Sequence, residues 1–139
     1  MSPHRTALPA RPVPARRALA ALVAILLSAA PLAAGTPQLK VYFAADFTDQ
    51  AYQQKSYTKV ATAWKRPAGA PKPGSKAVVT VSIARDGRGL LPALHMKSGS
   101  DAWDAAALTA VTKASPFDPL PASYKGASVE VHFHFEYNK

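Results

Sequence analysis

The sequence predicts an α+β domain of two layers, with a three-stranded antiparallel sheet and two helices packed on one of its faces. Two segments space apolar residues as a helix does, and three segments alternate apolar and polar residues as strands do. Stretches rich in Pro and Gly separate these segments. Each apolar stripe needs a partner, and placing both helices on one face of the sheet buries all of them.

The first predicted helix covers about residues 49–65. One face of it carries Tyr57, Val60, Ala61 and Trp64. Thr48 or Asp46 can cap its start, and Asp49 suits the positive end of the helix. Pro67 ends the helix, because proline has no N–H to continue it.

A hairpin is predicted next. Residues 77–84 alternate as a half-buried strand, and Asp86 and Gly87 form a tight turn. The return strand is expected over Leu90–Lys97. It contains Pro92, which cannot donate to a neighbouring strand, so this strand should lie at a sheet edge or carry a bulge.

The second helix is predicted over residues 101–113, with Ser100 as its N-cap and Trp103 on its apolar stripe. The last strand, Ser128–Tyr137, alternates most regularly, with apolar residues at every odd position. The short segment Leu39–Phe43 is rich in strand-forming residues, but it also fits the entry to the first helix.

The chain divides into three parts. Residues 1–35 predict a secretory signal peptide or an N-terminal membrane anchor, because a basic, Arg-containing start precedes an apolar run that ends in small residues. Residues 36–48 form a short lead-in, and residues 49–139 form the domain. Both alternatives for the first part place residues 36–139 outside the cytoplasm.

Composition excludes several classes of function. The chain has no cysteine, which rules out disulfides, thiol nucleophiles and Cys-ligated zinc. The net charge is +9, and four Arg of the first 17 residues contribute to it. From Thr36 onward, 13 basic and 8 acidic residues leave a spread-out +5. That charge favours an acidic partner or a membrane surface rather than nucleic acid.

The order of these motifs resembles the C-terminal domain of the TonB/TolA family. The residues that carry the resemblance are the helix with Tyr57, Val60, Trp64 and Pro67, the alternating strand before Asp86 and Gly87, the helix entry at Ser98 and Gly99, the loop Ala114–Phe117 with Pro119–Pro121, and the final strand. They cover about residues 50–137. Energy transducers of the family carry a long spacer after the anchor and polar residues within it. Here the first predicted helix begins about 15 residues after the apolar segment, and Ser28 is the only polar residue of Ala18–Ala34, so the energy-coupling role is not expected.

The resemblance implies a non-enzymatic, periplasmic domain for protein–protein interaction, with a link to transport across the envelope of a Gram-negative bacterium. Such domains bind an extended peptide of an outer-membrane receptor or a Tol-type protein by adding it as a strand. The partner-binding edge is expected on the C-terminal strand. Its residues are Ser128, Val129, Glu130, Val131, His132, Phe133, His134 and Phe135. The membrane is contacted only if the N-terminal segment stays uncleaved.

Two alternatives stay open. His132 and His134 lie on one face of a strand between two Glu, a pattern that can bind zinc, copper or nickel. A homodimer that pairs its own last strands is the other alternative. No enzyme motif is legible: Ser98–Ser100 lacks the Gly-x-Ser-x-Gly elbow, so no catalytic residue and no cofactor are predicted.

Overall fold

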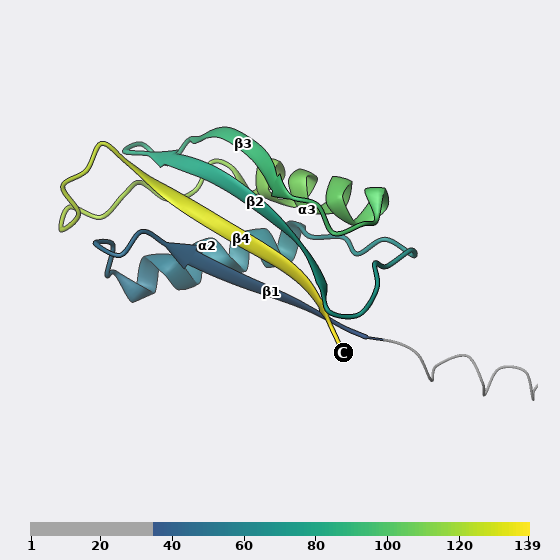
Figure 1. Ribbon diagram of the computed structural model, residues 1–139. Coiled ribbons are helices and arrows are strands. Elements are labelled where there is room, and N and C mark those ends of the chain that lie inside the picture. The colour runs from purple at the N-terminus through teal and green to yellow at the C-terminus, as the bar shows by residue number, and fades with distance from the viewer. Residues whose placement is uncertain (1–34) are drawn as a thin grey trace, which may run out of the picture. The chain divides into compact units, whose positions relative to one another are not determined.

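The computed structural model describes residues 35–139. The predicted signal peptide or anchor therefore lies outside the described residues, apart from Gly35. The elements, in chain order, are β1 (Thr36–Phe43), α2 (Gln50–Ala63), β2 (Ser75–Ala84), β3 (Gly89–Met96), α3 (Asp101–Ala114) and β4 (Ser128–Asn138) (Figure 1). Neither helix of this part of the chain is long and apolar enough to span a membrane.

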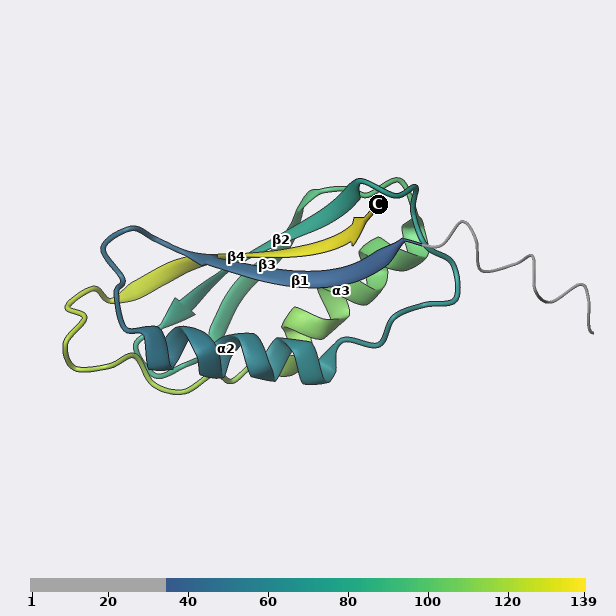
Figure 2. The same ribbon diagram turned by 90° about the horizontal axis from the view of Figure 1, so that it is seen from below.

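The four strands form one antiparallel sheet in the order β1-β4-β2-β3. Figure 2 shows both helices beneath one face of the sheet, as the sequence predicts. The predicted number of strands is wrong, because the lead-in forms a complete strand. β1 extends the expected segment Leu39–Phe43 by three residues and pairs with β4 along its whole length.

The core lies between the sheet and the helices. The odd-numbered residues of β4 from Val129 to Phe135 are at most 2% exposed, and Val79, Val81 and Ile83 of β2 are equally buried. Trp103 of α3 packs beneath them and donates a hydrogen bond from Nε1 to the carbonyl oxygen of Phe135 at 2.9 Å. The alternation predicted for β4 is therefore confirmed.

The helix ends follow local chemistry. Ser100 caps α3 as predicted, accepting a hydrogen bond from the backbone N–H of Trp103 at 3.2 Å. The cap predicted for α2 is wrong: Asp49, rather than Asp46 or Thr48, accepts from the N–H of Tyr52 at 2.9 Å. The three residues lie within one turn, and the sequence alone does not place the first helical residue that closely.

The long loop between α3 and β4 is tied to the β2–β3 hairpin. Gly87 has φ 96° and accepts a hydrogen bond from the N–H of Phe117, and a Cβ at this position would collide with the Phe117 carbonyl. The Arg85 guanidinium donates to carbonyl oxygens of the same loop, among them those of Pro121 and Tyr124. These bonds fix the path by which the chain enters β4.

Candidate functional site

The predicted partner-binding strand does not lie at an edge. β4 pairs with β1 on one side and with β2 on the other, so residues Ser128–Phe135 have a neighbouring strand on both sides, apart from the first three, which lie beyond the end of β1 (Figure 1). The expectation of an edge strand is wrong because Thr36–Phe43 occupies that edge. The apolar alternation of Leu39, Val41 and Phe43 was the signal that could have shown this.

The side chains of β4 point as predicted. Its odd-numbered residues are in the core, and Glu130, His132 and His134 lie on the face that the helices do not cover. His132 Nε2 lies 2.8 Å from Glu130 Oε1, and the ring of His134 packs on Tyr42 of β1 with centroids 4.6 Å apart. The backbone of β4 therefore organises the sheet, while its even-numbered side chains form part of an open face.

The side chains of His132 and His134 contact neighbouring side chains on the open face of the sheet. His95 of β3 approaches His132 with ring centroids 6.0 Å apart. Among residues 35–139, no three His, Cys, Asp or Glu side chains are grouped closely enough to hold a metal ion. Burial, followed by the nearby Lys76, lowers the pKa of His134, which favours its neutral form.

The two edges of the sheet are β1 and β3. β3 is irregular: its pairing with β2 shifts register twice, and Leu91 has φ 52°. Pro92 also removes one N–H from this strand. The prediction that Pro92 lies at an edge is confirmed. β1, in contrast, pairs with β4 in continuous register from Thr36 to Phe43.

The direction of the β1 backbone groups follows from its neighbours. The carbonyl oxygen of Tyr137 accepts a hydrogen bond from Gly74, just before β2, so the backbone of Tyr137 faces away from β1. In an antiparallel ladder this orientation alternates along the strand. Pro37, which lies opposite Tyr137 and has no N–H to give, and then Leu39 and Val41, therefore direct their backbone groups outward.

A groove lies between this edge and α2, and we call it the edge groove. It consists of two hollows of about 320 and 260 Å³ that share Tyr57. The amide hollow is lined by Val41, Gln50, Gln53, Gln54 and Tyr57. The Arg66 hollow is lined by Pro37, Gln38, Leu39, Tyr57, Ala61, Trp64 and Arg66.

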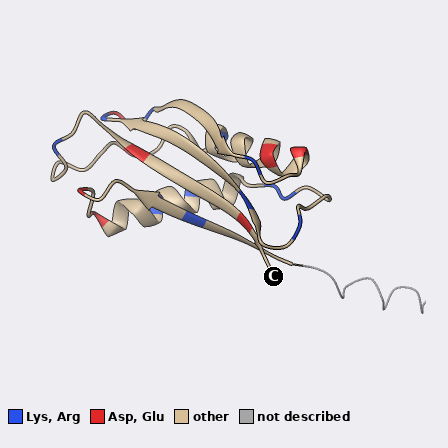
Figure 3. Cartoon of the chain, viewed as in Figure 1, with Lys and Arg blue, Asp and Glu red and all other residues tan. Residues whose placement is uncertain are grey.

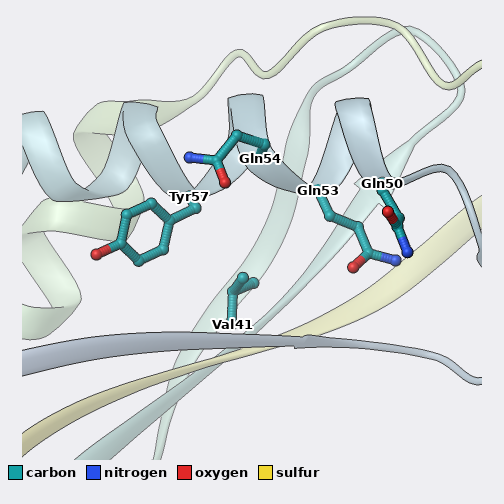
Figure 4. A pocket seen from close by; sticks show the side chains of 5 residues that line it. All are labelled: Val41, Gln50, Gln53, Gln54 and Tyr57. Carbon is teal, nitrogen blue, oxygen red and sulfur yellow. The ribbon is translucent and has the colours of Figure 1, made fainter.

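Figure 4 shows how the side chains meet in the amide hollow. Val41 points from β1 toward α2, and Tyr57 and Gln53 point from α2 toward β1. Gln53 Nε2 donates to the carbonyl oxygen of Phe47 at 3.0 Å, which holds the side chain against the loop before α2. The sequence placed Tyr57 on the core stripe. It is half-buried there, and its ring also forms the wall between the two hollows.

Charge around the groove is mostly basic. Lys40 of β1 pairs with Glu136 of β4 at 3.2 Å on the open face, and Arg66 lies over the Trp64 ring, 5.7 Å from its centroid. No Asp or Glu is among the residues that line the edge groove. Elsewhere in the described chain, Lys and Arg are spread over strands, helices and loops (Figure 3), as the sequence predicts.

An open, regular strand edge beside a groove can bind an extended chain through backbone hydrogen bonds. No curated protein and no solved structure matches this sequence significantly. The family model described as TonB C terminal matches residues 49–135, which is more than half of the chain. That range contains every described element from α2 through most of β4, and leaves out β1. The chain therefore belongs to the TonB C-terminal family.

Proposed function

We propose that this protein is an envelope interaction domain that binds an extended partner peptide as a fifth strand on the outer edge of β1. The observation that carries the proposal is the regular edge of β1 from Leu39 to Phe43, which lies beside the edge groove. Backbone groups on that edge supply affinity, and the two hollows supply places for alternate side chains.

The family supports the class of function. TonB-type domains are periplasmic, non-enzymatic domains that interact with other proteins in envelope transport. For this chain we propose a periplasmic location and a partner that is an outer-membrane receptor or a Tol-type protein. Of the residues first expected to bind, Val131–Phe135 pair with β1, so in this proposal they align the binding strand and do not contact the peptide backbone.

The other edge strand, β3, is less suited to pair with a partner peptide. Two register shifts and Pro92 interrupt the row of donors and acceptors on β3. Such irregularities are what natural sheets use to prevent pairing at an edge. β1 carries none of them between Leu39 and Phe43.

The test removes one outward N–H from β1. In Val41→Pro the strand β1 keeps its hydrogen bonds to β4, because the backbone N–H and C=O of Val41 point away from β4. The bound peptide loses the N–H donor of residue 41 and meets the proline ring instead. Val41→Ala is the matched control, since it shortens the same side chain and keeps the N–H. Random ten-residue peptides displayed on phage should yield binders of the wild type and of Val41→Ala, with affinity for Val41→Pro at least tenfold lower.

A second variant distinguishes strand addition to β1 from a binding mode in which the partner peptide displaces β1 and pairs with β4. Tyr42 and His132 lie opposite each other on β1 and β4, at a separation that a disulfide can bridge. Because the chain has no other cysteine, Tyr42→Cys with His132→Cys can form only this bond. Peptide binding that survives oxidation supports addition to β1, and binding that is lost on oxidation contradicts it.

A further inference from the structure

The edge groove also constrains the chemistry of the peptide, provided that the proposed strand addition holds. Core-facing side chains along an added strand recur every two residues, about 7 Å apart. β1 shows the same spacing, with Leu39 in the Arg66 hollow and Val41 in the amide hollow. Two successive core-facing side chains of a bound peptide therefore enter the two hollows, one on each side of Tyr57.

The amide hollow suits an uncharged polar side chain. Three Gln side chains and the side chain of Tyr57 line it, and amides offer both donors and acceptors. Gln50 is exposed and Gln53 is half-buried, and within residues 35–139 the side-chain amide of Gln50 and the side-chain oxygen of Gln53 form no hydrogen bond with another protein group. A Ser, Thr, Asn or Gln side chain of a visitor can complete these bonds.

The Arg66 hollow suits an acidic side chain. Leu39, Ala61 and the Trp64 ring give it apolar walls, and Arg66 is its one charged residue. The guanidinium is held over Trp64 and forms no ion pair within the described part of the chain. A carboxylate on a short aliphatic stem matches both parts, because the stem packs on the walls and the charge meets the guanidinium.

We infer that the partner strand is an acidic peptide, with an Asp or Glu directed to Arg66 and an uncharged polar side chain two residues away in the amide hollow. The +5 net charge of residues 36–139 adds long-range attraction for such a peptide. Arg66 is exposed, so the contact itself is modest, and it sets preference more than total affinity.

The test uses the full-length protein and random ten-residue peptides selected at low salt. Selected peptides are expected to be enriched in Asp or Glu at one position. Replacing that residue by the matching amide should weaken binding roughly two- to fivefold, the range of exposed ion pairs. Arg66→Gln should abolish the difference between the acid and the amide peptide. Arg66→Glu should reverse it in favour of a peptide with Lys at that position.

Lys65→Gln is the matched control. It removes the same charge one residue away, but Lys65 lines a different hollow, between α2 and α3. If Lys65→Gln and Arg66→Gln weaken acidic peptides equally, the preference is only a matter of net charge and the inference is wrong. Peptides that depend on Val41 but show no acidic preference also overturn it, while the proposed strand addition stands. If no peptide binds at all, the proposed function fails.

Discussion

The two edges of the sheet differ in how they are held and in what they offer to a partner. β1 is anchored along its length: Leu39 is 5% exposed, and Val41 and Phe43 pack against the same core. β3 instead places Leu91, which is 87% exposed, at a bulged position, with Leu90 and Met96 also exposed. Both edges belong to one sheet, yet only β1 combines a regular backbone with a groove beneath it.

The comparison teaches where a binding edge can arise. The resemblance predicts the C-terminal strand at the edge, whereas in the structure β1 pairs with Val131–Asn138 of that strand. Covering one edge with a strand always creates another edge, one strand further out. Since β1 lies beside α2, the edge groove lies along this outer edge.

Core truncation should separate the two edges most strongly. Leu39→Ala removes a buried side chain from β1, and we expect it to lower the free energy of unfolding by about 2–5 kcal/mol. Leu91→Ala, the matched change on β3, should stay within about 0.5 kcal/mol, because Leu91 is exposed. Urea denaturation measures both. Equal losses would mean that β1 is not the better anchored edge.

Substitutions at the ends of the two edge strands should lower the free energy of unfolding by less than Leu39→Ala does. Just beyond β3, buried Asp104 of α3 accepts hydrogen bonds from the N–H of Ser98 at 2.9 Å and from its hydroxyl at 2.7 Å. Asp104→Ala leaves a buried N–H without an acceptor and should cost about 1–3 kcal/mol. Asp104→Asn keeps one acceptor oxygen and should cost less.

The corresponding bond beside β1 runs from the N–H of Gly35 to the Tyr137 hydroxyl at 2.8 Å. Tyr137→Phe should cost about 1 kcal/mol, because this bond is only partly buried. Thermal unfolding of the variants compares the two ends. A larger loss for Tyr137→Phe than for Asp104→Ala would contradict the expectation that the buried bonds beside β3 stabilise more than the partly buried bond beside β1.

The smallest expected effect is the pH dependence of stability that comes from His134, on the β1 side of the open face. Burial and then Lys76, His132 and Lys40 lower the pKa of His134, while Glu136 opposes them. The folded protein therefore takes up a proton at lower pH than the unfolded chain does. Stability should fall as pH drops below about 6.5, where unfolded His begins to charge.

His134→Gln should make that fall in stability shallower, because it removes the group whose pKa is lowered by folding. Urea denaturation at several values between pH 7 and pH 5 measures the slope. An unchanged slope in His134→Gln would show that the ring packed on Tyr42 does not couple pH to stability.

Much of the fold could be predicted because it rests on local chemistry. The alternation from Val129 to Phe135 predicts β4, Ser100 caps α3, and Pro92 marks an edge strand. The candidate site could not be predicted in the same way. Gln50, Gln53 and Arg66 form no motif in the sequence, and they become related only because α2 lies beside β1.

By itself, the sequence determined both helices, the strands β2, β3 and β4, and the buried side of β4, since periodicity and caps act within a few residues. It left β1 undecided. Only the tertiary structure decided which strand edge stays open. Thr36 and Asn138 stand opposite each other although almost the whole domain separates them along the chain. Pairing of that kind depends on the competition of distant segments for one edge, and no local pattern records its outcome.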